Sequence, residues 1–499
     1  MLLYNTFHNS QTIYMLGARR PLSNKIIQCK SCNNKPKQCR ETTSIEKYQA
    51  DHKWTSTSWQ SKQKSTFTPT YEDNNKLLEV KYRLKYQRPP LIFANEVLDL
   101  RNNLCDVCDG NSFIIQGGEC AESVDKYDSD SIFDMFKTIV IMSIIISYSN
   151  NKRVIKILRG AGQYAKPRSN PTETRHGKTL PSYFGDSINS LEFNHDARQV
   201  DPMRMLHAHD VSSNTLNLLR SMSTSGYLSL YRLHDWINKD LRRDVNDEVI
   251  TNYIEIIKDI EKAINFMTNC GIDKNHKLHV PEVYTSHEAL LLDYEEPMVR
   301  KDSITGKYFC TSGHFVWIGD RTRYLDGQHV EFLRGVENPI GIKISKDTKL
   351  DELIDIIYVL NDDNSKGKIC LICRYGDEHI DKHFINLINA IAEAKLNVIY
   401  MIDPMHGNTY TLENGYKTRS FDKILSETQK FFKICQENSV YPGGVHLEMT
   451  GNDKSSECMH GLVKNDEIDV SNNYKSQCDP RLNLSQCIEY ICKITKLII

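Results

Sequence analysis

Eight short apolar runs, each ending at glycine, aspartate or another polar residue, recur along the chain and limit its fold more than any other feature. They lie at 112–118, 153–160, 278–285, 314–320, 339–345, 368–376, 397–404 and 443–449. Short apolar runs of this kind are typical of strands that are buried on both faces. Helical patterns such as 384–396 and 421–437 separate most of them. An eightfold alternation of strand and helix predicts an α/β fold, a (β/α)8 TIM barrel.

Two regions depart from this alternation. Residues 200–276 contain helical patterns alone, which predicts a helical insertion between strands two and three of the barrel. Residues 51–110 predict an N-terminal helical extension that is broken at Pro89 and Pro90. We therefore expect a tail at 1–50, the extension at 51–110, and a catalytic barrel at 111–499 that carries the insertion.

The tail is basic. Residues 1–40 contain seven lysines and arginines and no aspartate or glutamate. This composition is typical either of an organelle transit segment or of a disordered basic tail, and the two interpretations stay open. The first predicts a plastid or another organelle, and the second predicts a cytoplasmic protein.

Charge and hydropathy exclude some classes of function. The 63 basic and 64 acidic residues give a net charge of −1, which argues against a nucleic-acid partner. The longest apolar run, 138–148, is about half of what a membrane span needs and is expected to be a buried helix or strand. Fifteen cysteines without regular spacing favour a reducing compartment, and the three CxxC pairs, at 29/32, 105/108 and 370/373, are too far apart to predict a zinc module.

Four residues of metal-binding type follow neighbouring strands. Cys120 follows strand one, His406 follows strand seven, Glu448 ends strand eight, and Asp479 lies in the loop beyond. Strands seven, eight and one are adjacent in a closed barrel, so these side chains are expected to converge at its mouth. A thiolate, an imidazole and two carboxylates suit Mn²⁺, Fe²⁺, Co²⁺ or Zn²⁺. Each residue alone also has an ordinary structural explanation, and the prediction depends on the set.

A second group is cationic. Its members, at or near the ends of strands two, four, five and six, are Arg159, Arg321, Lys343 and Arg374, with Lys166 and Arg168 nearby. Buried cations need anionic partners, and converging guanidinium groups bind phosphate or carboxylate. We therefore expect a small substrate with several negative charges.

Two acidic residues near these cations are open to two interpretations. Asp320 stands beside Arg321 and Arg323, where a local salt bridge is the alternative to a role at the site. Glu288 is placed just past strand three, where it either contacts substrate or caps the following helix.

Six long segments together indicate a family. They are "QGGECAES", "RGAGQYAKPRS", "VWIGDRTRYLDGQHVEFLRGVENPIGIKI", "DPMHGNTYTLENGYKTRSFDKIL", "YPGGVHLEMTGNDKSSEC" and "CDPRLN". In this order they closely resemble the class II, plant-type 3-deoxy-D-arabino-heptulosonate 7-phosphate synthases, and the resemblance extends from about residue 53 to the C-terminus.

The resemblance implies the first step of the shikimate pathway, in which phosphoenolpyruvate condenses with erythrose 4-phosphate and phosphate is released. It implies a divalent metal, most simply Mn²⁺, at Cys120, His406, Glu448 and Asp479, and a homo-oligomer. Arg159, Arg321, Lys343 and Arg374 match phosphoenolpyruvate-binding positions, and Lys166, Arg168, Ser169 and Glu288 match positions around the erythrose phosphate.

The reaction needs a proton for the new alkoxide. Lys166, Lys343 and a water bound to the metal are alternative sources. Asp320 would position the attacking water or phosphoenolpyruvate, and it stands where the family usually has glutamate. Gly160 stands where a larger apolar residue is usual, so a lowered rate is expected.

Two further hypotheses stay open. A catalytically silent barrel that serves regulation or binds a partner enzyme is the alternative to an active enzyme. Cys478, beside Asp479, is expected to form a disulfide with Cys120 under oxidation and so to expel metal.

Overall fold

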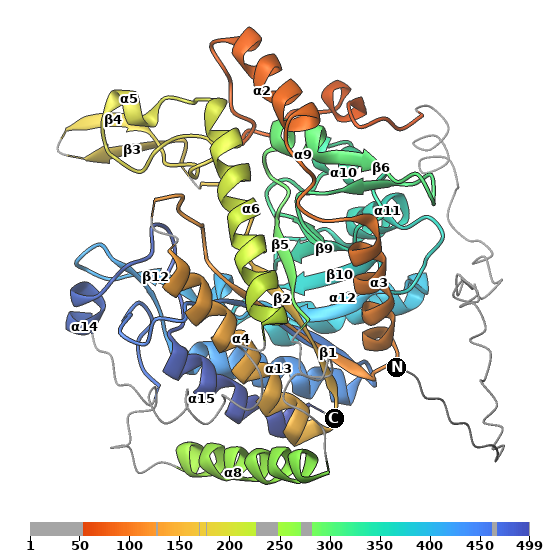
Figure 1. The fold of residues 1–499 in the computed structure, drawn as a ribbon, viewed down its shortest axis with the longest axis vertical. Coiled ribbons are helices and arrows are strands. Elements are labelled where there is room, and N and C mark those ends of the chain that lie inside the picture. The colour runs from red at the N-terminus through yellow and green to blue at the C-terminus, as the bar shows by residue number, and fades with distance from the viewer. Residues whose placement is uncertain are drawn as a thin grey trace, which may run out of the picture. The chain divides into compact units, whose positions relative to one another are not determined.

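Eight parallel strands close into a barrel in a computed structural model that describes residues 53–125, 128–168, 170–175, 177–225, 248–270, 282–461 and 467–498 (Figure 1). In spatial order the strands are β1 (Ser112–Gly118), β2 (Arg153–Arg159), β5 (Tyr284–Glu288), β8 (Phe315–Ile318), β9 (Ile340–Ile344), β10 (Ile369–Cys373), β11 (Ile399–Ile402) and β14 (Pro442–Glu448), which pairs with β1. The predicted (β/α)8 barrel is confirmed. β11, β14 and β1 are neighbours, as the metal-site prediction requires.

The third strand of the barrel differs from the prediction. The expected run was 278–285, but β5 begins at Tyr284 and ends at Glu288, and residues 271–281 lie outside the described part. His287 and Glu288 are thus in the strand rather than after it. Polar residues are tolerated there because they bond inside the barrel: Gln116 of β1 donates to Ser286 Oγ at 3.0 Å.

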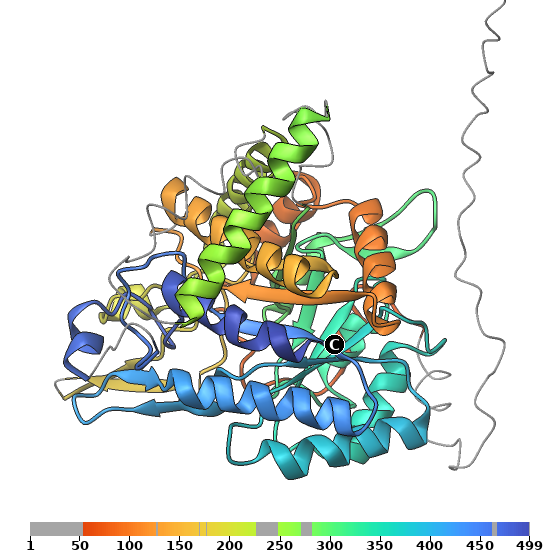
Figure 2. The ribbon, with the colours of Figure 1, turned by 90° about the horizontal axis from the view of Figure 1, so that it is seen from below.

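Helices surround the barrel. They include α4 (Ser129–Asn150), α9 (Leu292–Met298), α10 (Gln328–Leu333), α11 (Leu350–Leu360), α12 (Ile380–Ala394), α13 (Phe421–Glu437) and α15 (Leu484–Ile494). The predicted helices at 384–396 and 421–437 correspond to α12 and α13, which lie side by side (Figure 2). The apolar run 138–148 is the middle of α4. By length and composition α4 could cross a membrane, and 67% of its most apolar window is buried within the fold.

The region before the barrel forms η1 (Ser58–Ser61), α2 (Asn74–Tyr86) and α3 (Ala94–Cys108), so the helices stop on either side of Pro89 and Pro90. Leu100, Leu104 and Val107 of α3 pack in one apolar cluster with residues of the barrel strands, including Ile114. Burial of this face against the strands fixes the extension to the barrel.

Between β2 and β5 the chain forms the hairpin β3 (Thr172–Arg175) and β4 (Lys178–Pro181), then α5 (His195–Arg198), α6 (Met203–Thr224) and α8 (Glu248–Asn269). α8 packs against α4 and α15. The remaining elements are β6 (Val299–Lys301), β7 (Tyr308–Cys310), η4 (His406–Asn408), β12 (Thr409–Thr411), β13 (Lys417–Arg419), α14 (Glu467–Asn472) and η5 (Thr495–Leu497). The predicted domain boundaries stay a prediction, and the basic tail and Cys29/Cys32 lie outside the described residues.

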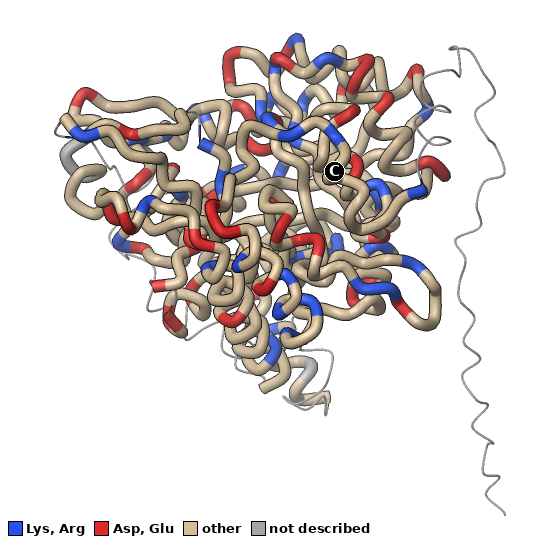
Figure 3. Tube along the Cα trace, turned by 90° about the horizontal axis from the view of Figure 1, so that it is seen from above, with Lys and Arg blue, Asp and Glu red and all other residues tan. Residues whose placement is uncertain are grey.

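Acidic and basic residues are interspersed along the visible trace (Figure 3), in keeping with the net charge of −1. The cysteines of the other two CxxC pairs, Cys105, Cys108, Cys370 and Cys373, are free thiols.

Candidate active site

Three of the four predicted metal ligands gather at the mouth of the barrel. Candidate ligand atoms of Cys120, Glu448 and Asp479 lie within 4.8 Å of one another. Cys120 and Glu448 are buried, and Asp479 is partly buried. His406, in η4, borders this group, because its Nε2 lies 3.1 Å from Glu448 Oε1. The soft and hard donors of this set fit a divalent transition metal.

Lys166 lies among the same ligands. Its Nζ donates to Cys120 Sγ, lies 2.6 Å from Asp479 Oδ2, and lies 3.5 Å from Glu448 Oε1. Burial lowers the pKa of a lysine, but these three neighbours outweigh burial and raise the pKa of Lys166 well above its usual range. Lys166 therefore links the metal-ligand group to the loop after β2.

Glu448 is the centre of charge at the site. Arg159 donates to it at 3.1 Å, and Arg419 Nη2 forms an ion pair with it at 2.8 Å, in addition to its contacts with His406 and Lys166. Burial by itself raises the pKa of this carboxyl, but His406, Lys166 and Arg419 outweigh burial and hold the pKa well below its usual range. Glu448 is therefore a carboxylate at neutral pH, as a metal ligand must be.

Two of the predicted anion-binding cations, Arg159 and Lys343, lie over the same aromatic ring, that of Trp317. The Arg159 guanidinium lies 5.2 Å from the centroid of the Trp317 ring, and Lys343 Nζ lies 5.9 Å from it. Both cations are buried. Lys343 pairs with Asp403 Oδ2 at 2.5 Å. Burial lowers the pKa of Lys343 to about 8, although Asp403 opposes that effect.

Asp320 pairs with arginines from two elements. Arg323 donates to Oδ1 at 3.1 Å, and Arg374 donates to Oδ2 at 3.3 Å. Ser345 also donates to Oδ1. Arg321 instead points toward Pro167, whose carbonyl accepts from it at 3.4 Å. Asp320 thus forms salt bridges, as the alternative interpretation predicts, and one of its two partners is the predicted site residue Arg374.

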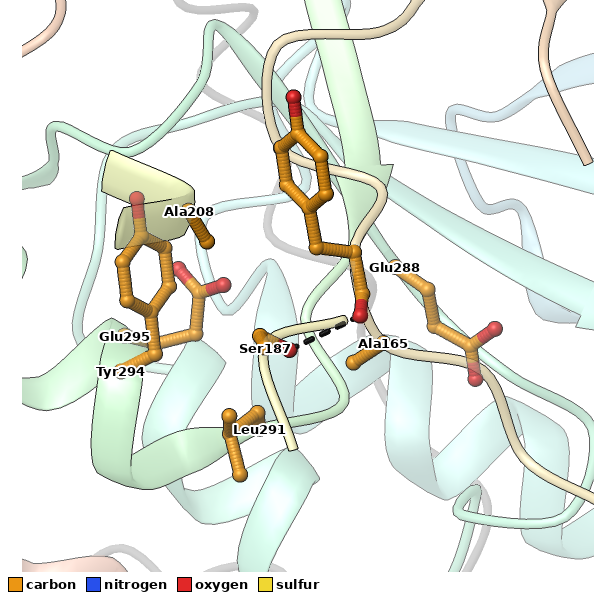
Figure 4. Close-up of a pocket in the computed structure, with 9 residues that line it drawn as sticks. Ala165, Ser187, Ala208, Glu288, Leu291, Tyr294 and Glu295 are labelled. Atoms are coloured by element: carbon orange, nitrogen blue, oxygen red, sulfur yellow. Dashed lines mark hydrogen bonds between the residues drawn. The ribbon is translucent and has the colours of Figure 1, made fainter. Parts of the chain in front are cut away.

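Glu288 is partly buried between the cations and a small pocket, which Gly162, Ala165, Ser187, Ala208 and Leu291 also line (Figure 4). Burial raises the pKa of its carboxyl, and Lys343, Lys166 and Arg159 oppose that effect. The helix-cap alternative is wrong: α9 has Leu291 at its N-cap and no side-chain capping bond.

Two predicted residues remain, and the structure describes one of them, Arg168. Arg168 Nη1 donates to Cys478 Sγ at 3.3 Å. Ser169 lies outside the described residues.

Three buried carboxylates that sequence reasoning missed hold the loops of the site. Asp403 accepts from His406 Nδ1 at 2.7 Å as well as from Lys343. Glu122 accepts the backbone N–H groups of 161–163, between Arg159 and Lys166. Glu457 accepts backbone N–H groups at 475, 476 and 481, on both sides of Asp479. Asp403 was visible in the motif "IDPMHG", three residues before His406.

The fold and the site together define a barrel enzyme whose reaction centre lies at the carboxyl ends of the strands. The model of the Class-II DAHP synthetase family matches residues 54–495. The chain belongs to this family, and it is therefore an enzyme of the transferase class. The expectation drawn from the six motifs is confirmed.

Known proteins with similar sequences agree. The chain is 41% identical over 424 residues to the phospho-2-dehydro-3-deoxyheptonate aldolase of Streptomyces coelicolor, covering 84% of this chain and 92% of that protein. It is 41% identical over 452 residues to the enzyme of the same name from Neurospora crassa, covering 87% and 92%. It is 35% identical over 416 residues to phospho-2-dehydro-3-deoxyheptonate aldolase AroG of Mycolicibacterium smegmatis, covering 82% and 88%.

We expect mild oxidation to block metal binding through Cys478. Cys478 and Cys120 pack in one buried cluster, and the interaction with Cys120, aided by Lys166 and Arg168, lowers the pKa of Cys478 to about 7 against the opposing effect of burial. A thiolate reacts with hydrogen peroxide, and closure of a disulfide releases two waters per peroxide and two thiols. Peroxide should then abolish Mn²⁺ binding in the native chain, and electron paramagnetic resonance of Mn²⁺ measures this loss. Cys478→Ser should keep most of it, and equal losses in both proteins would contradict the disulfide.

Proposed function

We propose that this chain condenses phosphoenolpyruvate with erythrose 4-phosphate, giving 3-deoxy-D-arabino-heptulosonate 7-phosphate and phosphate in a metal-dependent reaction. The observation that carries the proposal is the placement of Cys120, Glu448 and Asp479, with His406 beside them, next to the buried cations Arg159 and Lys343. Family membership and the names of the relatives agree with this reaction.

The residues present fit a divalent metal, most simply Mn²⁺, with Co²⁺, Fe²⁺ and Zn²⁺ as the other candidates. Cys120, His406, Glu448 and Asp479 would hold it, and Asp403 fixes His406 by accepting its Nδ1–H, which leaves Nε2 free to coordinate. The metal would supply Lewis-acid polarisation of the aldehyde.

The protein side chains do the rest. Arg159, Lys343, Arg374 and Arg321 would hold the phosphate and carboxylate of phosphoenolpyruvate, while Lys166, Arg168, Ser169 and Glu288 would surround the aldose phosphate. This placement brings carbon 3 of phosphoenolpyruvate to the aldehyde carbon, so that two substrates react as one oriented pair. Water then adds at carbon 2, the bond from carbon 2 to the phosphate oxygen breaks, and phosphate leaves.

A proton must reach the alkoxide formed from the aldehyde. Lys166 contacts the metal-ligand group directly, and Lys343, with its pKa near 8, exchanges protons readily at neutral pH. Asp320, held by Arg323 and Arg374, would orient the attacking water.

The test is consumption of phosphoenolpyruvate by the purified protein with erythrose 4-phosphate, after chelation and again after Mn²⁺ is added, beside His406→Ala. We expect activity that the chelator removes and Mn²⁺ restores, and no restored activity in the variant. A native chain that stays inactive with each of the four metals would contradict the proposal and favour the silent barrel. A homo-oligomer, and an organelle location for a chain with this basic tail, also remain proposals.

A further inference from the structure

A chain of buried polar side chains crosses the interior of the barrel beneath the site. Ser286 of β5 donates to the carbonyl of Leu158 at 3.1 Å, and Gln116 Nε2 of β1 donates to Ser286 Oγ at 3.0 Å. Gln116 Oε1 lies 2.8 Å from His446 Nδ1 of β14, and His446 Nε2 lies 2.6 Å from Arg159 Nη1. All four side chains are buried.

Arg159 fixes the direction of every bond in this chain. A guanidinium only donates, so His446 Nε2 must be an unprotonated acceptor. A neutral imidazole then carries its proton on Nδ1, which donates to Gln116 Oε1. This leaves the amide nitrogen of Gln116 facing Ser286, where the structure places it.

The bond to His446 decides how Arg159 presents its remaining donor. Within the described residues, its Nε–H goes to the carbonyl of Glu119, and its Nη2 faces the carboxylate of Glu448 and the carbonyl of Cys120. Within the same residues, Nη1 gives one N–H to His446 and has no other acceptor. The second N–H of Nη1 is therefore the donor that is left for a ligand, and its direction depends on the imidazole.

Trp317 supports the same arrangement. Its ring lies under the Arg159 guanidinium and meets the His446 ring edge-on, with centroids 5.3 Å apart and planes at 89°. His446 and Trp317 thus restrict the guanidinium from two directions, one by a hydrogen bond and the other by its aromatic face.

We propose that His446 is a positioning residue for substrate binding: oriented by Gln116 and Ser286, it holds the Arg159 guanidinium so that one Nη1–H meets the anionic groups of phosphoenolpyruvate. This inference rests on the proposed function, which gives Arg159 that substrate. The alternative is a core histidine that serves packing alone.

Two substitutions separate these roles. In His446→Gln the side-chain oxygen can reach the position of Nε2 and still accept from Arg159. In His446→Asn the shorter amide reaches only the position of Nδ1, so the contact with Gln116 survives and the acceptor for Arg159 is lost. We expect the asparagine variant to raise the KM and the Kd for phosphoenolpyruvate about tenfold or more, with a smaller fall in kcat, because a hydrogen bond to a charged group is lost. The glutamine variant should recover most of that affinity.

Calorimetric titration of phosphoenolpyruvate into the Mn²⁺-loaded protein without erythrose phosphate keeps the two proposals distinguishable. If the native chain binds phosphoenolpyruvate in this titration but does not condense it with erythrose 4-phosphate in the activity assay, the proposed function is contradicted and the positioning role stands. Equal affinities for the native chain and His446→Asn, or equal losses in both variants, would overturn the positioning role. If His446→Asn fails to fold, Gln116→Met is measured in its place. Gln116→Met removes the acceptor of His446 Nδ1–H, so that the imidazole can turn, and it should weaken phosphoenolpyruvate binding severalfold. Unchanged binding in Gln116→Met would overturn the inference.

Discussion

We expect Glu448→Gln to lower the free energy of unfolding by about 3–5 kcal/mol at pH 7, because it removes the negative charge from a buried group of cations. Glu448 is fully buried and contacts Arg159, Lys166, His406 and Arg419. Without that charge, Arg159, Lys166 and Arg419 keep their own charges in a medium that solvates them poorly. The variant should also fail to bind Mn²⁺. Urea denaturation of the chelated protein measures the first effect, and electron paramagnetic resonance measures the second.

The difference in free energy of unfolding between the native chain and Glu448→Gln changes with pH in a definite direction. The folded-state pKa of Glu448 is lowered, so the stability that its carboxylate contributes is present above the unfolded pKa of about 4.3 and is lost as the pH falls toward the folded pKa. The difference between native chain and variant should therefore narrow by about 1.4 kcal/mol per pH unit below about pH 4.3.

Glu427→Gln is the matched control. Glu427 of α13 is also buried, but it accepts from neutral donors, the N–H groups of Tyr375 and Gly376 and the amide of Asn408. Burial raises its pKa to about 8, although the Gly376 N–H opposes that effect. At pH 7 the carboxyl is mostly protonated, so substitution by a neutral amide should change stability by about 1 kcal/mol or less. Equal losses in the two variants would contradict the argument from charge.

The sequence predicted the barrel because its strands are buried on both faces and read as continuous apolar runs. The third strand was misplaced because Ser286, His287 and Glu288 are polar. Ser286 bonds to Gln116 of β1 and His287 pairs with Glu295 of α9, and no local pattern reveals these partners. Because strands seven, eight and one are neighbours in a closed barrel, the sequence also predicted that Cys120, Glu448 and Asp479 lie close together.

The sequence could not predict the hydrogen bonds and ion pairs that connect the residues of the site. The placement of Lys166 among the ligands depends on the course of the loop after β2, which Glu122 holds by its backbone. Asp403 joins Lys343 to His406 because β9 and β11 both flank β10, so the link spans residues that are 60 positions apart in sequence. A side chain that acts through another residue carries no mark in a sequence read alone.

Lys343 should set an alkaline limit on substrate capture. We expect kcat/KM for phosphoenolpyruvate to fall about tenfold per pH unit above about pH 8, because kcat/KM reports the ionisation of the free enzyme. Burial lowers the pKa of Lys343 to about 8, with Arg159 and Arg374 adding to that effect and Asp403 opposing it. The binding-competent form is the ammonium, so its population falls as the pH rises through that pKa. The phosphate of the substrate is already a dianion in this range, since its second pKa is about 6, and does not contribute to the decline.

Lys343→Arg separates this cause from a general loss at high pH. A guanidinium stays charged throughout the measured range, so the variant should keep a flat profile from pH 7 to beyond pH 9, at a lower level because the larger group fits the pair with Asp403 less well. Saturation with phosphoenolpyruvate should flatten the native profile too, because the bound anion raises the pKa of the lysine and keeps it protonated. An equal decline of kcat/KM in both proteins would remove Lys343 from this role and assign the limit to another group of the site.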